Sequence, residues 1–432
     1  MSFEIIPTKK SFKNYLYFMF GQQFSLLGSG IIGFVITWWI TIETQSAIYL
    51  SIATFLIFIP QVIVTPFAGV VADRISRKTI IMIVDSGQAI LTLGLFFLFF
   101  FDLTDIWFIL LIHTMRNVLF AIQVPAFQAI IPSMIPKDKL SRINGANFLF
   151  SGIIFMVGPI LSALLLELFP ITYIFLIDVV TYLIALIPLL LIKIPHQRKD
   201  IGNLKKEPFM KELVDGFKLV KSIPGLLALI CFAMIFNFIF RPFNVLWPYY
   251  INITHGGTAF DLAFIFGAIQ IGNIIGSIIT TVKKKWNSKV KVNIIGESVF
   301  FMAYLLVIFA PYRQFYIMML GGFLGAIMFP ITVATYLTIF QEVVPSDKIG
   351  RAMSIDHTIS MAIAPIGALI AGPAADFMGI TNLYLICAII GIINPILLWF
   401  FTKIRKLDQI SKIEVKDFTD KKLMEIEMEQ KI

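Results

Sequence analysis

The chain has 432 residues, of which 58% are hydrophobic and only 14% are charged. This charged share is about half that of an ordinary soluble protein, so polar side chains are too few to cover two or three soluble domains. A bilayer-spanning helix needs about 20 apolar residues, and the composition provides enough for about twelve. It excludes a disordered chain, a fibre and a soluble enzyme, and favours a twelve-helix membrane protein.

Twelve apolar runs follow one another along the chain, separated by short polar breaks. They lie at residues 15–40, 46–71, 80–101, 106–130, 141–168 and 171–193, and then at 223–252, 259–282, 292–310, 315–343, 349–376 and 381–402. Most lack helical periodicity, as expected of helices that are apolar on every side inside a bundle in lipid. The first run is too long for the hydrophobic core of a signal peptide, so we predict an uncleaved first span.

The positive charges predict an orientation in the membrane. The net charge is +9, and 32 of the 35 Lys and Arg residues fall into inner segments if the N-terminus is cytoplasmic. Such an excess of bases is typical of cytoplasmic loops. The outer loops hold Arg313 and the acids Glu43, Asp102, Asp105, Glu167, Asp261 and Asp376. We therefore predict that both termini are cytoplasmic. We interpret the positive charge as a signal for orientation in the membrane rather than as a sign of nucleic-acid binding.

The spans fall into two sets of six. We predict an N-terminal six-helix bundle at 1–193, a cytoplasmic linker at 194–222, a C-terminal six-helix bundle at 223–402 and a cytoplasmic tail at 403–432. Aligning residues 131–160 with residues 340–369, an offset of 209, gives seven identities in 30 positions. Two parallel six-helix repeats with the substrate site between them are an architecture of many secondary transporters.

The most specific local motif is G-V-V-A-D-R-I-S-R-K, residues 69–78, at the inner end of the second span. One interpretation is that its bases only orient this span. The other starts from Asp73, which lies at a helix C-terminus, where the helix dipole disfavours a negative charge. A partner one turn away or at the start of the eleventh span would form a charge cluster that locks the two halves in one state. The candidate gating residues are Gly69, Asp73, Arg74, Arg77, Lys78 and Asp356.

This motif resembles the loop 2–3 signature of the major facilitator superfamily, G-x-x-x-D-R-x-G-R-[RK], with Ser76 in place of the second glycine. The fifth span resembles the signature of antiporter members of that family. The matching residues are Gly145, Gly158 and Pro159, and the departures are Ile154, Ser162 and Ala163.

Further segments resemble the bacterial macrolide efflux pumps and their drug-exporter relatives within this superfamily. They are residues 20–29, 340–351 and 364–376. The resemblance implies the major facilitator fold, an all-α membrane protein of twelve transmembrane helices in two pseudo-symmetric six-helix bundles. It also implies export of drugs.

A charge within a span costs about 2.5–3.5 kcal/mol on insertion scales and marks function by default. Arg116 stands where the superfamily often keeps an Arg for proton coupling, and a structural ion pair is the alternative. For Asp85 we favour a structural role. Asp178 and Arg241 either pair across the halves or form a titratable site. Because few bases lie near Asp178 in sequence, we predict it as the proton carrier, with Arg116 as its changing partner and Asp85 next.

The substrate cavity is expected among the first, fourth, seventh and tenth spans. Its predicted polar residues are Gln22, Gln23, Asn117, Asn237, Asn244, Thr332 and Tyr336. The 43 Phe residues suit an aromatic pocket for bulky ligands, although most of them are expected to face lipid. The first span has no acid to compensate a desolvated cation, so we expect neutral or weakly basic, mostly apolar cargo rather than small permanent cations.

The sequence carries no motif for ATP hydrolysis or nucleophilic catalysis and no paired His or Cys site. We therefore expect neither an enzyme, a cofactor nor a metal site. The sequence indicates a monomeric exporter in the cytoplasmic membrane, with a small lipophilic substrate, protons and membrane lipid as partners. The alternatives are an exporter of lysophospholipid or siderophore, and a non-transporting membrane receptor or scaffold, which would have no need of the gating motif or the charges in spans.

The gating hypothesis predicts the effect of Asp73→Asn. This change removes a charge contact but no core packing, so the variant should insert at wild-type levels and transport little substrate. Arg77→Ala should behave in the same way. Efflux from cells, normalised to the amount of protein in the membrane, measures the effect, and wild-type efflux by both variants would contradict a gating role.

Overall fold

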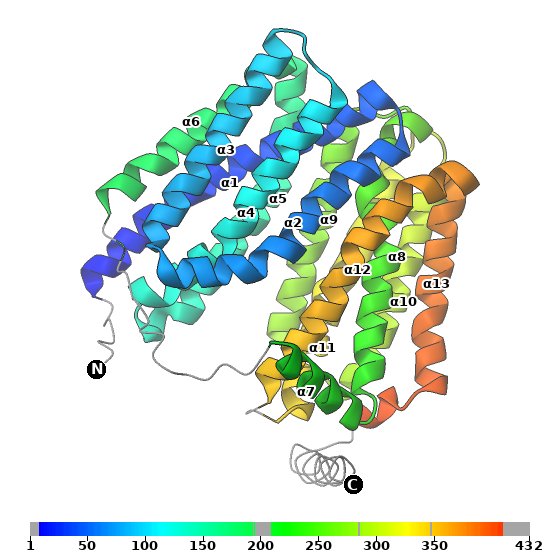
Figure 1. The fold of residues 1–432 in the computed structure, drawn as a ribbon. Coiled ribbons are helices and arrows are strands. Elements are labelled where there is room, and N and C mark those ends of the chain that lie inside the picture. Colours follow the sequence, from blue (N-terminus) through cyan, green and yellow to red (C-terminus); the bar gives the residue numbers. More distant parts are fainter. Residues whose placement is uncertain (1–7, 193, 195–208, 284–285, 346–347, 409–432) are drawn as a thin grey trace. The chain divides into compact units, whose positions relative to one another are not determined.

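The computed structural model describes residues 8–192, 194, 209–283, 286–345 and 348–408, which are almost entirely helical. The helices are α1 (Lys9–Thr44), α2 (Ala47–Arg74), α3 (Arg77–Phe100), α4 (Ile106–Met134), α5 (Leu140–Leu168), α6 (Ile171–Leu191), α7 (Phe209–Ser222), α8 (Leu226–Tyr249), α9 (Ala259–Val282), α10 (Lys289–Ile308), α11 (Phe315–Val343), α12 (Ile349–Met378) and α13 (Ile380–Phe401) (Figure 1). Short helical turns are η1 (Lys137–Lys139), η2 (Tyr250–Thr254) and η3 (Ile404–Asp408). Within the described residues, twelve helices are long and apolar enough to cross a membrane. The predicted all-α, twelve-span fold is therefore confirmed.

Several helices extend beyond the apolar runs that predicted them. α1 begins at Lys9, where Thr8 caps it: the Ser11 backbone N–H donates to Thr8 Oγ1 over 3.1 Å, and the Thr8 N–H donates to Ser11 Oγ over 2.8 Å. α2 continues to Arg74, three residues beyond the apolar run at 46–71 that predicted it. Hydropathy thus marks the part of a helix suited to lipid, whereas the capping side chain of Thr8 sets where α1 begins.

The chain forms two compact units. One consists of residues 1–202 and 245–267, and we call it the N-unit; the other consists of residues 203–244 and 268–432, and we call it the C-unit. Residues 195–208, in the predicted linker, and the tail from 409 onward lie outside the described residues.

The N-unit is organised around α1, α3, α4 and α6. α1 packs against α5 and α6, α3 packs against α4 and α6, and α2 packs against α4 (Figure 1). One of its cores joins Phe18 of α1 and Ile81 of α3 to Ile130 of α4, all of which are buried. These contacts bring four helices that are distant in sequence close enough for their polar side chains to meet.

The C-unit is organised around α10, which packs against α11 and α13, and α7 lies against α12. Val220 near the end of α7 and Ile223 just after it are buried in a core with Phe340 of α11. α7 is too short to span a bilayer. Its apolar side instead completes this core.

The helix boundaries reveal a repeat longer than the sequence alignment showed. α11, α12 and α13 begin at residues 315, 349 and 380, each 209 residues after the first residue of α4, α5 and α6. This is the same offset that aligned residues 131–160 with residues 340–369. The second halves of the two six-helix sets are therefore built on one plan.

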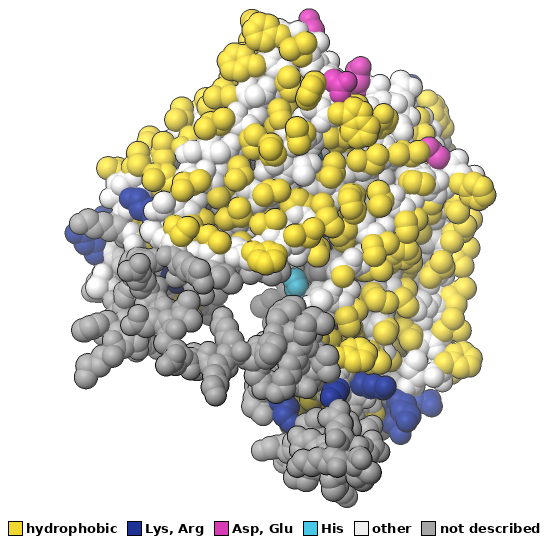
Figure 2. All heavy atoms as spheres, viewed as in Figure 1, with side chains coloured by type: hydrophobic (Ala, Val, Ile, Leu, Met, Phe, Trp, Pro, Cys, Tyr) yellow, Lys and Arg dark blue, Asp and Glu magenta, His cyan; other side chains and the backbone are white. Residues whose placement is uncertain are grey.

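The molecular surface has the character expected in a bilayer. Figure 2 shows hydrophobic side chains over much of the visible face, with few described charged side chains among them. Large apolar side chains such as Leu191, Phe377 and Phe401 are at least 80% exposed. In water such exposure would be costly, whereas lipid accommodates it.

The close packing of α10 and α11 predicts the effect of a single methyl group. A Cβ at Gly321 would lie 2.8 Å from the Ala303 carbonyl oxygen and 3.0 Å from Leu306 Cβ. Gly321→Ala should therefore destabilise the protein by about 1–3 kcal/mol through overpacking, less up to about 1 kcal/mol of helix propensity. Thermal unfolding in detergent measures this loss. Gly30→Ala is the control, because nothing lies within 4 Å of that Cβ, and an equal loss in both variants would contradict the packing argument.

Candidate functional site

A buried ion pair lies inside the N-unit, where four helices meet. Arg116 Nη1 of α4 donates to Asp178 Oδ2 of α6 over 2.8 Å, and their side chains are only 7% and 5% exposed. Thr92 Oγ1 of α3 donates to the same carboxylate oxygen over 2.7 Å. Ser29 Oγ of α1 donates to Asp178 Oδ1 over 3.1 Å. The carboxylate is therefore compensated by a cation and two hydroxyls, the arrangement that a buried charge requires.

A second carboxylate in the same unit is compensated without a cation. Gln22 Nε2 of α1 donates to Asp85 Oδ2 of α3 over 2.9 Å, and Gln123 Nε2 of α4 donates to Asp85 Oδ1 over 2.6 Å. Asp85 is 4% exposed. No ion pair to Asp85 occurs in the described part of the chain: Arg77 Nη1 donates instead to the Ala129 carbonyl over 2.6 Å.

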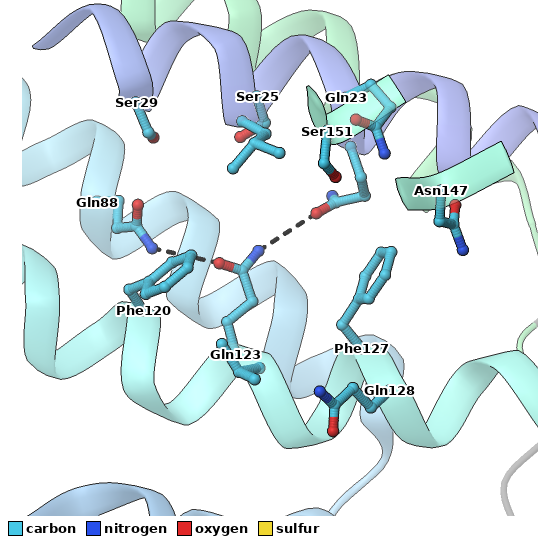
Figure 3. Close-up of a pocket in the computed structure, with 13 residues that line it drawn as sticks. Gln23, Ser25, Ser29, Gln88, Phe120, Gln123, Phe127, Gln128, Asn147 and Ser151 are labelled. Atoms are coloured by element: carbon cyan, nitrogen blue, oxygen red, sulfur yellow. Dashed lines mark hydrogen bonds between the residues drawn. The ribbon is translucent and has the colours of Figure 1, made fainter. Parts of the chain in front are cut away.

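A cavity of about 210 Å³ lies beside both carboxylates (Figure 3). Its polar wall consists of amides and hydroxyls, and its apolar wall includes two aromatic rings of α4. The lining residues are Gln22, Gln23, Ser25, Leu26, Ser29, Gln88, Phe120, Gln123, Val124, Phe127, Gln128, Asn147 and Ser151. None of these side chains carries a charge. Asp85 and Asp178 do not line the cavity themselves, but Gln22, Gln123 and Ser29, which do, are bonded to them.

The cavity wall is linked to both carboxylates by hydrogen bonds. Ser29 lines the cavity and donates to Asp178. Gln88 Nε2 donates to Gln123 Oε1 over 3.4 Å, while its backbone carbonyl accepts from Thr92 Oγ1 over 2.9 Å. A change at either carboxylate therefore reaches a group that a ligand in the cavity would contact.

Of the seven residues predicted to line the substrate cavity, Gln22 and Gln23 line this one. Four others are bound within their own helices: Asn117, Asn237 and Asn244 each donate to the carbonyl four residues earlier, and Thr332 Oγ1 donates to the Phe329 carbonyl. The Tyr336 hydroxyl of α11 donates to Asp356 of α12.

The gating motif occupies the end of α2 and the start of α3, and it is only partly described. The side chains of Asp73 and Arg74, and the surroundings of Gly69, are outside the described set. Lys78 Nζ donates to the carbonyls of Leu190 and Ile192 over 2.9 and 2.8 Å. The predicted cluster of these residues thus stays a prediction.

Asp356, the sixth gating candidate, has two partners inside the C-unit. It accepts hydrogen bonds from Tyr336 and, over 3.3 Å, from Ser360 Oγ. Arg241 of α8 packs closely against α12, where a Cβ on Gly367 would lie 3.0 Å from Arg241 Cγ.

The three antiporter-type residues all lie within α5. Nothing lies within 4 Å of a Cβ built on Gly145, and one on Gly158 would meet Leu27 Cδ1 of α1 at 3.9 Å. Pro159 stands inside the helix, and Ser162 Oγ donates to the Gly158 carbonyl over 2.7 Å. A side chain at Gly158 would thus make an ordinary contact with α1.

Sequence reasoning missed most of the polar cavity wall. The missed residues are Ser25, Ser29, Gln88, Gln123, Gln128, Asn147 and Ser151. A usable signal was present, because Gln88, Gln123 and Gln128 are uncharged amides inside otherwise apolar runs. It also missed Glu297, an acidic residue of α10 that is only 2% exposed.

Comparison with known proteins places the fold and the family. The sequence model described as Major Facilitator Superfamily matches residues 18–355 and 284–424. The chain belongs to the major facilitator superfamily. Its members are membrane transporters, so the prediction that the chain is no enzyme is confirmed.

Two relatives and one solved structure show how similar this superfamily member is to known transporters. It is 26% identical to macrolide efflux protein A of Streptococcus pyogenes over 394 residues, covering 90% of this chain and 96% of that protein. It is 25% identical to the staphyloferrin A transporter of Staphylococcus aureus over 399 residues, covering 90% and 97%. A crystal structure of the nucleoside transporter NupG matches with a TM-score of 0.69 at 12% identity, covering 90% and 98%, and shows the same fold. The predicted resemblance to macrolide efflux proteins is confirmed.

The buried pair predicts unequal effects of single and double substitutions. Arg116→Met leaves the Asp178 carboxylate buried without a cation and should destabilise the protein by about 3–5 kcal/mol. Replacing both residues, as Arg116→Met with Asp178→Leu, removes the uncompensated charge and should restore part of that loss. The measurement is thermal unfolding of the four proteins of this double-mutant cycle. A double variant as unstable as the sum of the two single losses would show that the pair is not coupled.

Proposed function

We propose that this superfamily member exports lipophilic small molecules across the cytoplasmic membrane in exchange for protons. The observation that carries the proposal is the Arg116–Asp178 pair, buried beside a polar cavity in the N-unit. The similarity to a macrolide efflux protein supports export as the direction. Alternating access between the two six-helix bundles, 1–193 and 223–402, supplies the cycle.

Asp178 is the proton carrier in this scheme. Thr92 has one hydroxyl hydrogen and two acceptors within reach, Asp178 Oδ2 at 2.7 Å and the Gln88 carbonyl at 2.9 Å. When Asp178 takes a proton, it becomes a donor to Thr92, and the hydroxyl hydrogen turns to Gln88. Thr92 and the carboxyl group therefore keep their hydrogen bond in either state. Arg116 loses its anionic partner at that step, so the ion pair no longer holds its side chain in place.

The cavity chemistry supports neutral or weakly basic cargo. Phe120, Phe127 and Leu26 offer apolar contact area, while Gln23 and Asn147 offer neutral hydrogen bonds. A small permanent cation would find no free carboxylate there, since Asp85 and Asp178 are both engaged. Desolvating such a cation would go uncompensated.

The orientation and the gate complete the proposal. Both termini face the cytoplasm, with the linker 194–222 and the tail 403–432 on that side, and the protein works as a monomer in contact with lipid. The segment from Gly69 to Lys78, with Asp356, acts as the gate between the bundles. The excess of bases in the inner segments supports this orientation.

A siderophore exporter is the second candidate, favoured by the similarity to the staphyloferrin A transporter. The two candidates differ in phenotype. A strain lacking a siderophore exporter loses secreted iron chelator from its medium, whereas a strain lacking a drug exporter becomes sensitive to lipophilic compounds.

The proposal predicts the pattern of resistance in a host without its own drug pumps. The wild-type protein should raise resistance to erythromycin more than to ethidium or tetraphenylphosphonium, and a protonophore should remove the difference. Asp178→Asn should abolish efflux driven by a pH gradient in inside-out vesicles while leaving substrate binding. Asp105→Asn, which alters an N-cap carboxylate at the start of α4, is the matched control and should keep wild-type efflux.

Two outcomes would count against this scheme. Stronger resistance to the permanent cations than to erythromycin would refute the assignment of cargo. An Asp178→Asn variant that still concentrates substrate against a gradient would move the proton to another site, with Asp85 next.

A further inference from the structure

A second cavity of the N-unit lies between α1 and α5. Its volume is about 160 Å³, and we call it the apolar pocket. α1 contributes Phe20, Phe24 and Leu27, and α5 contributes Phe150. Among the described residues that line the pocket, Gln23 alone is polar. The pocket therefore offers contact area to an apolar group and a hydrogen bond at one position.

Gln23 also lines the cavity of about 210 Å³ described above, which we call the polar cavity. The two cavities are neighbours because α5 presents a different face to each. Asn147 and Ser151 line the polar cavity, whereas Phe150 and Ile154 line the apolar pocket. Residues four apart lie on one face of a helix, so each pair marks one face of α5. Gln23 of α1 thus stands where the two cavities meet.

Two hydrogen-bonding atoms in the wall of the polar cavity lack a partner in the part of the chain that the structure describes. Gln23 Oε1 and Asn147 Oδ1 are buried, and no described residue donates to them. Asn147 Nδ2 is engaged, since it donates to the Tyr15 hydroxyl over 2.9 Å. Figure 3 shows Gln23, Asn147 and Ser151 on the same side of the cavity. A buried polar atom without a hydrogen bond is unfavourable, so a ligand that bonds to both atoms is stabilised there.

A hydroxyl group suits these atoms better than a charged group does. It both donates and accepts, so it pairs with either end of a side-chain amide. No residue that lines the polar cavity is charged, and Asp85 and Asp178 are already bonded to side chains of the N-unit. A phosphate or a permanent cation would lose its hydration here without gaining an opposite charge. The polar cavity therefore favours an uncharged group that carries hydroxyls.

We propose that the polar cavity and the apolar pocket form one two-part binding site for uncharged amphiphiles. The hydroxyl-bearing part of the ligand occupies the polar cavity and bonds to Gln23 and Asn147, while an attached alkyl or aryl group occupies the apolar pocket. Gln23 determines specificity, because it meets the ligand where its polar part joins its apolar part. The inference rests on the proposed function, for which it names the substrate class and a site within the N-unit.

The test compares three probes that share parts of the expected ligand. Hexyl glucoside carries both parts, glucose carries the polar part alone, and hexyltrimethylammonium carries the same alkyl chain on a permanent cation. The full-length protein is held in lipid nanodiscs, and binding is followed by equilibrium dialysis, with empty nanodiscs as the blank. Hexyl glucoside should bind at least about tenfold more tightly than either other probe, because only it fills both cavities without burying a charge.

Gln23→Leu tests the hydrogen bond at the junction of the two cavities. It should weaken the binding of hexyl glucoside about tenfold, as expected when a buried hydroxyl loses its partner. Gln61→Leu is the matched control. It makes the same substitution in α2, at a residue that lines neither cavity, and should keep the wild-type affinity.

Ile153→Asn tests the apolar pocket, which this residue lines. In the wild-type protein, each methylene group added between methyl glucoside and hexyl glucoside should raise the affinity by up to about fourfold. The variant should lose most of this gain but bind methyl glucoside as the wild type does. Ile90→Asn is the control, because Ile90 is 67% exposed on α3 and lines neither cavity. It should keep the full gain.

An unchanged affinity for hexyl glucoside in Gln23→Leu would overturn the proposal, because the amide would then have no ligand to bind. Equal binding of hexyltrimethylammonium, no saturable binding of hexyl glucoside, or a full gain with chain length in Ile153→Asn would overturn it as well. None of these results depends on transport. A failure of proton-driven efflux in vesicles would instead refute the proposed function and leave the binding results to stand.

Discussion

The constraint on which the N-unit depends is that a polar group inside a membrane helix bundle has no water to bond with. Each carboxylate must find its partners on other helices, and this ties α1, α3, α4 and α6 together at fixed points. Asp178 is reached from three of these helices, and Asp85 from two. The polar cluster thus fixes how these helices pack as much as it provides chemistry.

The two carboxylates meet this constraint in different ways. Asp178 is balanced by a full positive charge, so its ionised form is compensated by Coulomb attraction as well as by hydrogen bonds. Asp85 is held by amide dipoles alone, from two glutamines that are also bonded to each other. The first arrangement depends on a cation that can move away, whereas the second has no cation to lose. One cavity wall is connected to both.

The sequence predicted the features that depend on composition and on rare residues. Twelve spans follow from the amount of apolar sequence, and Arg116 and Asp178 stood out because a charge in an apolar run is uncommon. Their pairing depends on how α4 and α6 pack, which the sequence does not state. Asn117 and Asn237 each bond to their own helix backbone, so their predicted place in the substrate cavity stays a prediction. Gln88 and Gln123 are visible in the sequence as amides inside apolar runs, but their contact depends on how α3 and α4 pack.

Helices α4 to α6 of the N-unit repeat as α11 to α13 of the C-unit at an offset of 209 residues, but corresponding positions carry different residues. The C-unit positions that correspond to Arg116 and Asp178 are Gly325 and Cys387. Gly325 packs against the ring of Tyr304, so volume rather than charge decides which residue fits there. Tolerance to substitution should therefore differ between the repeats. In the N-unit a polar position can change only together with its partner, whereas its C-unit counterpart can change alone as long as its size is kept.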